Sequence, residues 1–108
     1  MSATDHLIHA NSVYVETFPG ARPLRPKLAL TIIECMDSRL DTFAALGLQI
    51  GDAHIIRNAG GLITDDVLRS LALSQRYLGT REVMIMHHTN CGMTGFDDVA
   101  FRAQLAAD

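Results

Sequence analysis

The sequence predicts an α/β domain, with a small parallel β-sheet flanked by helices and an N-terminal helical arm. Three short apolar segments, residues 28–34, 53–57 and 82–86, have the length and aliphatic content of strands. Segments with helical spacing or helix-capping residues follow each of them, an alternation typical of parallel sheets with right-handed crossovers. The three prolines lie together between residues 19 and 26 and separate an amino-terminal segment from the rest of the chain.

The amino-terminal segment is predicted to be an amphipathic helical arm. Apolar side chains recur there at loosely helical spacing: Leu7, Ile8, Tyr14, Val15 and Phe18. Residues 19–27 are expected to be a linker, because each proline fixes φ and lacks an N–H donor. The expected organisation is one domain over residues 1–108, in which 1–18 form the arm and 28–108 form a zinc-binding α/β core.

The strands of this core are predicted to be short and largely buried. Residues 28–34 (LALTIIE) form a nearly continuous apolar run, which is typical of a strand covered on both faces. Residues 53–57 (AHIIR) are expected to form a second short strand. Residues 82–86 (EVMIM) are expected to form a third strand, also buried.

The predicted helices are marked by residues at their ends. A brief helix over residues 40–46 is expected to end at Gly47, because glycine readily adopts the left-handed conformation of a C-terminal cap. A longer helix is expected to begin after Thr64, whose hydroxyl can cap it, and to end at Gly79. A final helix is expected over residues 97–107.

Composition and charge exclude several classes of partner. A net charge of -3 gives no basic surface, so neither nucleic acid nor a membrane is an expected partner. No apolar stretch approaches the roughly 20 residues of a spanning helix, and the amino terminus lacks the basic-then-apolar pattern of a signal peptide. We therefore expect a cytoplasmic protein, in which Cys35 and Cys91 are thiols or metal ligands rather than a disulfide.

Polar clusters follow the predicted strands at one edge of the sheet. They comprise residues 35–39, 58–61 and 88–91. In open α/β sheets, ligands bind at the carboxyl ends of the strands. Taken singly, a buried cysteine is usually a small apolar residue and an Asp–Arg pair is usually a loop salt bridge. Their convergence on one edge favours a binding site.

The donors in two of these clusters suit zinc. Cys35, His88 and Cys91 supply two thiolates and one imidazole, and the spacing of three between His88 and Cys91 lets one turn bring both to a single ion. A Cys₂His set leaves a fourth position for water, as in catalytic zinc sites. Thiolates with imidazole favour zinc over magnesium or calcium. We expect one Zn²⁺ per chain, carrying a hydroxide at neutral pH.

Asp37 and Arg39 are the candidate catalytic residues beside this ion. In extended geometry, residues two apart point to the same side, so Cys35 and Asp37 can face one site. Asp37 is expected to orient the zinc-bound hydroxide by accepting a hydrogen bond from it. Arg39 is expected to hold Asp37 ionised and away from the metal through a bidentate pair. If that pair broke, Asp37 could become a fourth ligand and close the site.

The two motifs resemble those of the β-class carbonic anhydrases. Cys-x-Asp-x-Arg at 35–39 followed by His-x-x-Cys at 88–91 is similar to the signature of that family, and the resemblance extends over residues 28–93, closest to its short bacterial and actinobacterial branch. It implies zinc on Cys35, His88 and Cys91, the dyad Asp37 and Arg39, and reversible hydration of CO₂ to bicarbonate and a proton. It also implies a homodimer or homotetramer, with the arm lying on a neighbouring subunit.

Two other functions stay open. Carbonyl sulfide or carbon disulfide could be hydrolysed on the same zinc site, because the same nucleophile attacks the same kind of linear carbon. Family members usually continue past the position of Asp108, so we expect a short chain with an exposed sheet edge that depends strongly on oligomerisation or is marginally stable. A truncated, non-catalytic zinc-binding module is therefore the second alternative. His54, Asp52 or buffer could carry the released proton.

Overall fold

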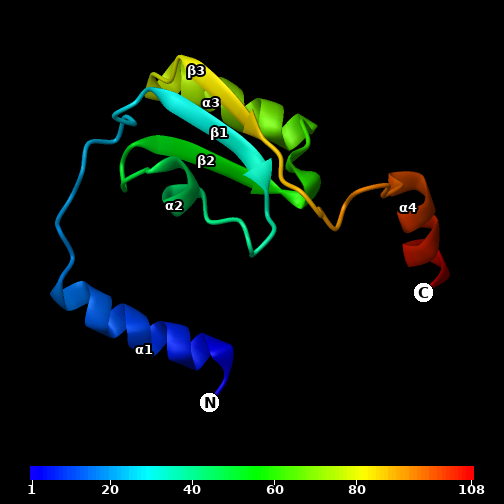
Figure 1. Cartoon of the computed structure of the whole chain (residues 1–108), viewed down its shortest axis with the longest axis horizontal. Helices are drawn as coiled ribbons and strands as arrows, with labels where there is room; N and C mark the ends of the chain where they lie inside the picture. The colour runs from blue at the N-terminus through cyan, green and yellow to red at the C-terminus, as the bar shows by residue number, and fades with distance from the viewer.

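The computed structural model describes all 108 residues and contains the predicted parallel sheet (Figure 1). The strand order is β2-β1-β3, and both pairings are parallel. The α/β class is therefore confirmed. None of the helices combines the length and apolar character needed to cross a membrane. The elements in chain order are α1 (Ala3–Glu16), β1 (Leu30–Cys35), α2 (Thr42–Leu46), β2 (Ala53–Asn58), the 3-10 turn η1 (Ala59–Gly61), α3 (Asp65–Leu78), β3 (Glu82–Met86) and α4 (Asp98–Ala107).

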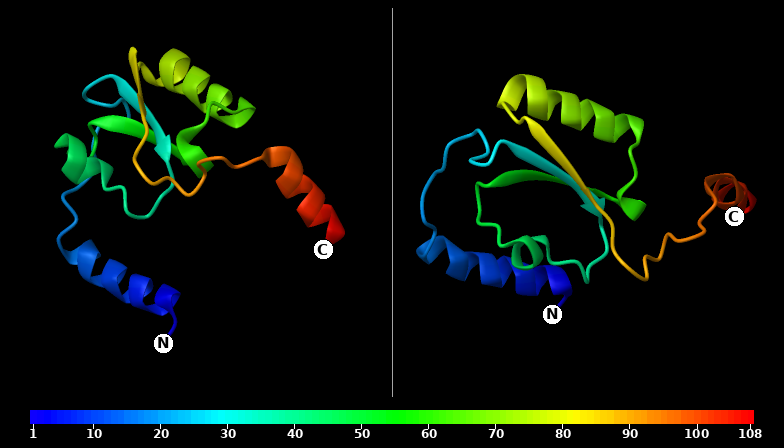
Figure 2. Two further views of the ribbon diagram at one scale, coloured as in Figure 1. Left: turned by 45° about the vertical axis from the view of Figure 1, so that its right-hand side comes forward. Right: turned by 45° about the horizontal axis from the view of Figure 1, so that its top comes forward.

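The central strand β1 is covered on both faces, as predicted. Helix α3 lies over one face of the sheet and α2 lies near the other (Figures 1 and 2). Every residue of β1 after Leu30 is buried. Because side chains alternate along a strand, Thr31 and Ile33 share one face and Glu34 lies on the other. Only 10 of the 108 residues are buried in all, so the packed core depends heavily on this one strand.

Buried hydroxyl groups fix α3 to the sheet. The Thr31 and Ser74 hydroxyl oxygens lie 2.6 Å apart, and Ser74 lies 2.8 Å from the Thr80 hydroxyl. His54 Nδ1 lies 2.7 Å from the same Ser74 oxygen. Each of these buried polar groups thus has a hydrogen-bond partner, as buried polar groups require.

Two predicted element boundaries were wrong by two residues. Strand β1 starts at Leu30 rather than Leu28, because Ala29 adopts a φ of 52° and donates its N–H to the Pro26 carbonyl. Helix α2 starts after Asp41 rather than at Leu40. The Asp41 carboxylate accepts the N–H of Ala44 and caps the helix. The helix that Thr64 caps and Gly79 ends was predicted correctly.

Strand β3 has the predicted bounds, but the prediction that it is buried was wrong. Val83 and Met84 are each 40% exposed, and Ile85 is 54% exposed. Strand β3 lies at the edge of the sheet, where it pairs with β1 alone. A strand with a neighbour on one side only leaves its outer backbone edge unpaired. The predicted exposed edge is therefore present in this structure.

Helices α1 and α4 extend away from the sheet (Figures 1 and 2). The predicted N-terminal helix is present, but neither α1 nor α4 contains a buried residue. The radius of gyration is 17.1 Å. A compact domain of this length would have a radius of roughly 13 Å. The apolar side chains of both helices are therefore left unburied, although Tyr14 of α1 contacts Phe18 and Phe101 of α4 contacts Phe96.

Candidate metal centre

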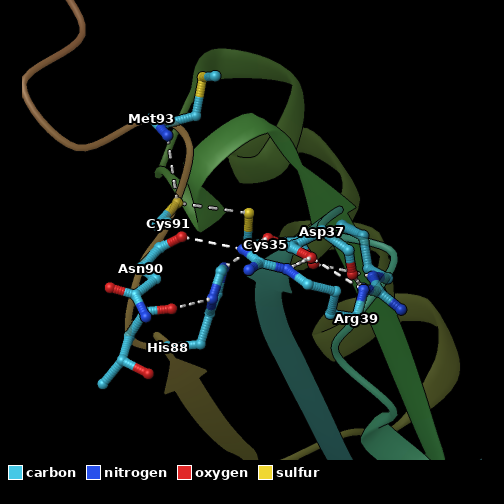
Figure 3. A network of polar contacts seen from close by, with 9 residues as sticks. Cys35, Asp37, Arg39, His88, Asn90, Cys91 and Met93 are labelled. Atoms are coloured by element: carbon cyan, nitrogen blue, oxygen red, sulfur yellow. Dashed lines mark hydrogen bonds and ion pairs between the residues drawn. The ribbon is translucent and has the colours of Figure 1, made fainter.

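The three predicted ligands meet at the carboxyl edge of the sheet (Figure 3). Cys35 ends β1, while His88 and Cys91 lie in the segment that follows β3. Their candidate donor atoms all lie within 4.8 Å of one another. The two Sγ atoms are 3.7 Å apart and both cysteines are free thiols. The sheet thus brings together residues that are far apart in the sequence.

His88 directs one ring nitrogen to this cluster. Its Nδ1 lies 2.9 Å from the Thr89 carbonyl oxygen, so Nδ1 is the nitrogen that donates a proton. Its Nε2 is buried and forms no hydrogen bond of normal geometry. A metal-binding histidine commonly has this arrangement, with one nitrogen fixed by a carbonyl and the other free to coordinate. Two thiols and this nitrogen therefore fit a zinc ion.

Asn90 makes the turn that brings His88 and Cys91 together. Its φ is 54°, a left-handed conformation that asparagine tolerates better than most residues. Its carbonyl oxygen accepts a hydrogen bond of 2.9 Å from Arg39 Nη2. The turn is therefore tied directly to the segment that carries Cys35. Sequence reasoning missed this role. The available signal was an asparagine, which favours a left-handed turn, between the two candidate ligands His88 and Cys91.

The surroundings of Cys35 favour its thiolate form. The neighbouring His88 side chain is the main cause that lowers the pKa of Cys35 to about 7, and backbone N–H groups of Asp37 and Gly60 act in the same direction against the effect of burial. The pKa of His88 is raised, first by Cys35 and then by the Thr89 carbonyl. A thiolate available near neutral pH is ready to bind a cation.

Asp37 and Arg39 form the predicted bidentate pair (Figure 3). Arg39 Nη2 donates to Asp37 Oδ2 at 2.6 Å and Arg39 Nε donates to Oδ1 at 3.0 Å. These contacts hold the pKa of Asp37 well below its usual range, so the carboxylate is ionised. Asp37 Oδ2 lies 3.8 Å from His88 Nε2. Asp37 thus lies beside the three donors while Arg39 occupies both of its oxygens.

A cavity of about 560 Å³ opens beside the donors. His88 and Cys91 line it on the side of the donor cluster, and Leu62, Met93 and Phe96 supply an apolar wall. Small apolar molecules gain free energy by leaving water for such a surface. The cavity therefore places an apolar surface beside the polar donor cluster.

The third polar cluster, residues 58–61, has a structural role. The Asn58 side chain closes the turn by accepting the Leu62 N–H at 2.9 Å and donating to the Leu62 carbonyl at 2.8 Å. Gly61 has a φ of 64°, and a Cβ there would lie 3.0 Å from the carbonyl carbon of Glu34. Only glycine lets η1 approach β1 this closely, which brings the Gly60 backbone near Cys35.

The candidate proton carriers do not lie at this site. His54 belongs to the hydroxyl cluster under α3 and pairs with Thr31 near the amino end of the sheet. Four residues of strand, roughly 13 Å, separate Thr31 from Cys35. Asp52 precedes β2 at the same end and accepts the N–H of Gln49. The structure therefore does not support either residue as the proton carrier.

Arg57 is a residue of the site that sequence reasoning missed. It lies on β2 and donates hydrogen bonds to main-chain carbonyls of the segment that carries Cys35 and Asp37. It also forms an ion pair with the buried Glu34. The available signals were a glutamate inside an apolar strand and an arginine at the carboxyl end of the neighbouring strand.

Comparison with known proteins agrees with this geometry. The family model described as carbonic anhydrase matches residues 30–103, a range that contains all the predicted site residues. Beta-carbonic anhydrase 1 of Mycobacterium tuberculosis is 50% identical over 102 residues, which cover 94% of this chain and 63% of that protein. A carbon disulfide hydrolase of Saccharolobus solfataricus is 49% identical over 73 residues, which cover 66% of this chain and 36% of that protein.

Solved structures show the same relationship. The crystal structure of carbonic anhydrase from Streptococcus mutans matches with a TM-score of 0.89 and 51% identity, covering 100% of this chain and 66% of that chain. The chain spans about 63% of the length of the curated mycobacterial relative. Since the family model covers more than half of the chain and the site motifs lie within it, the chain belongs to the β-carbonic anhydrase family.

Proposed function

We propose that the protein catalyses the reversible hydration of CO₂ to bicarbonate and a proton, with one zinc ion held by Cys35, His88 and Cys91. The observation that carries this proposal is the buried His88 Nε2, which has no hydrogen-bond partner and lies within 4.8 Å of the two thiol sulfurs. A zinc ion bound there would lower the pKa of a water molecule toward ~7 and so supply a nucleophile at neutral pH.

Asp37 would orient the attacking water. Its ionised carboxylate can only accept hydrogen bonds, so it would take one from the water and direct an oxygen lone pair toward the carbon of the substrate. Arg39 would keep Asp37 in this position through its two hydrogen bonds. The same contacts oppose rotation of Asp37 into the donor cluster, where it would become a fourth ligand.

The substrate is proposed to occupy the cavity of about 560 Å³ against its apolar wall. CO₂ is small and has no net dipole, so it needs no polar partner there. Carbon disulfide has the same linear shape, and the similarity to a carbon disulfide hydrolase makes its hydrolysis the second candidate activity. We place CO₂ first because the mycobacterial relative is similar over more of the chain.

Activity of the zinc-loaded chain tests the proposal. Stopped-flow measurements between about pH 7 and 9 should show CO₂ hydration, since a suitable nucleophile forms in this range. Release of hydrogen sulfide from carbon disulfide under the same conditions would instead support the second candidate. If one zinc is bound per chain and neither substrate reacts, the enzyme proposal is wrong and a non-catalytic zinc-binding module is favoured.

Replacing Asp37 by asparagine tests its proposed role. Asp37→Asn should lower turnover by about 10-fold to 100-fold while one zinc stays bound, since residues that support a metal site typically have effects of this size. Turnover and zinc content should be measured on the same preparation. Unchanged turnover would show that Asp37 does not orient the water.

We also propose that the chain assembles as a homodimer or homotetramer, with α1 on a neighbouring copy. The support is that α1 has no buried residue and that its apolar side chains are exposed, with Leu7 69% and Val15 65% exposed. Burial of such side chains against a second copy would be favourable. Sedimentation across a dilution series tests this, and a well-folded monomer at high dilution would contradict it.

A further inference from the structure

Arg57 joins two points of the segment that carries the candidate site. Its Nε donates to the carbonyl oxygen of Cys35 at 2.9 Å, and its Nη2 donates to the carbonyl oxygen of Asp37 at 2.8 Å. These carbonyls flank Met36, so one guanidinium group spans the main chain between Cys35, a proposed metal ligand, and Asp37, the proposed water-orienting residue. No other side chain bonds both ends of this segment.

Glu34 holds Arg57 in place from inside the sheet. It is paired directly with Arg57 across β1 and β2, and its side chain is 0% exposed. Its Oε1 lies 3.5 Å from Arg57 Nε and accepts a hydrogen bond from the Thr42 hydroxyl, while Oε2 is buried without a partner. A buried carboxylate is costly unless a cation accompanies it. Glu34 therefore favours the position in which the guanidinium lies against the end of β1.

We propose that Arg57, held by Glu34, is a positioning residue that sets the geometry of the segment from Cys35 to Arg39. Its catalytic consequence rests on the proposed zinc function, whereas the positioning itself is a property of the metal-free chain. Arg57 is directed to main-chain oxygens rather than to the donor cluster. It acts through Cys35 and Asp37.

The geometry requires arginine rather than a positive charge alone. Two carbonyl oxygens are reached by two different nitrogens of one rigid plane. Lysine has a single nitrogen on a flexible chain and does not reproduce this fork. Arg57→Lys is therefore the informative variant, because it keeps the charge beside Glu34. Arg69→Lys on the exposed face of α3 is the matched control.

Amide hydrogen exchange of the metal-free chain measures the positioning directly. The Met36 N–H donates to the Asn58 carbonyl, and the Arg39 N–H donates to Asp37 Oδ1. In Arg57→Lys both amides should exchange about tenfold faster, as expected for a lost hydrogen bond. The Ile33 amide in the centre of β1 should be unchanged. Equal acceleration at Ile33, or no acceleration at Met36 and Arg39, would overturn the proposal.

Metal release measures the consequence for the site. Zinc should leave Arg57→Lys about 10-fold to 100-fold faster than it leaves the unaltered chain or Arg69→Lys, the usual range for residues that support metal ligands. The cobalt-substituted form should show a shifted thiolate-to-metal absorption band. Identical release rates and spectra would refute the role of Arg57, even if CO₂ is hydrated.

The two proposals can fail separately. If the unaltered chain binds no metal, the proposed function is wrong, while the exchange of Met36 and Arg39 still decides whether Arg57 positions the segment. Should Arg57→Lys fold poorly, the double variant Glu34→Gln with Arg57→Met removes both charges together and leaves no unpaired buried ion. This variant should show the same faster exchange at Met36 and Arg39, and unchanged exchange would refute the proposal.

Discussion

The two halves of the candidate metal centre are held in different ways. Cys35 is 3% exposed and ends the one strand that is buried on both faces. His88 and Cys91 follow β3, an edge strand whose central residues are 40% to 54% exposed. The donors of both halves nevertheless lie within 4.8 Å of one another. One half is thus positioned by the packed core, and the other follows a strand with little cover.

The exposed half is tied to the buried half by few contacts. Arg39 donates to the Asn90 carbonyl, and the thiol of Cys91 lies near that of Cys35. Cys35, in contrast, is backed by Arg57, Glu34 and the close approach of η1. Metal binding should therefore order the His88 and Cys91 segment more than the Cys35 segment, because a bound ion stabilises the conformation that binds it.

The largest expected effect is a difference in stability between matched substitutions in β1, which carries Cys35, and in β3, which precedes His88 and Cys91. Ile33 and Ile85 face each other across β1 and β3, but Ile33 is fully buried and Ile85 is half exposed. Ile33→Ala should lower the free energy of unfolding by about 2–5 kcal/mol through the cavity it leaves. Ile85→Ala should cost less than about 1 kcal/mol, as for exposed positions. Urea denaturation of both variants measures the difference.

Equal losses at the two positions would show that β3 is packed in solution as β1 is. That result would point to cover of β3 by another copy of the chain. If Ile33→Ala does not fold, Ile33→Val gives the smaller loss of about 0.5–1.5 kcal/mol expected for one methylene in a core.

The next effect tests the close approach that supports Cys35. Gly61 and Gly47 have similar φ values of 64° and 66°, but only at Gly61 would a Cβ meet backbone, 3.1 Å from the Cys35 nitrogen. Both changes to alanine should cost about 1–2 kcal/mol for the left-handed conformation. Gly61→Ala should cost about 1–3 kcal/mol more because the neighbouring backbone must shift.

Thermal or urea unfolding of Gly61→Ala and Gly47→Ala provides the comparison. Gly61→Ala should also release zinc faster, whereas Gly47→Ala, which has open space around it, should not. Similar stabilities for the two variants would show that η1 can move away from β1 without cost, and that Cys35 does not depend on this contact.

The sequence predicted that Cys35, His88 and Cys91 lie together, because that prediction needs only the positions of the strands along the chain. Residues after the ends of parallel strands meet at one edge, so Cys35, His88 and Cys91 could be brought together without knowledge of packing. Arg57 and Asn90 escaped prediction because they act through main-chain carbonyls. Which carbonyl each reaches depends on strand register and on a left-handed turn, and side-chain chemistry does not encode either.

The error on β3 has a different cause. The residues EVMIM would look the same in a central strand and in an edge strand, because an apolar run reports preference for burial and not the number of neighbours. Burial of β3 is decided by which strands and helices lie beside it. The arm was predicted as a helix for the opposite reason, since the spacing of its apolar residues is a local property of the sequence.

The smallest expected effect concerns the pH dependence of α1, which the hydrogen bonds between Ser2 and Asp5 set at its amino end. Ser2 caps the helix, its hydroxyl oxygen lies 3.0 Å from Asp5 Oδ2, and its backbone N–H donates to the same oxygen at 3.0 Å. These bonds lower the pKa of Asp5 from its ordinary value of 3.8. The ionised carboxylate therefore stabilises the helix above that value, and the stabilisation is lost as the pH falls through the lowered pKa.

Amide chemical shifts of residues in α1 should therefore change modestly below about pH 4 in the unaltered chain. In Ser2→Ala this change should be smaller, and the pKa of Asp5 should return toward 3.8. Ser12→Ala is the matched control, because the Ser12 hydroxyl donates to the His9 carbonyl within α1 and does not contact Asp5. If both variants titrate alike, the amino end of α1 is set by packing against another copy. In that case α1, like the buried strand β1, would be stabilised by packing rather than by hydrogen bonds within its own sequence.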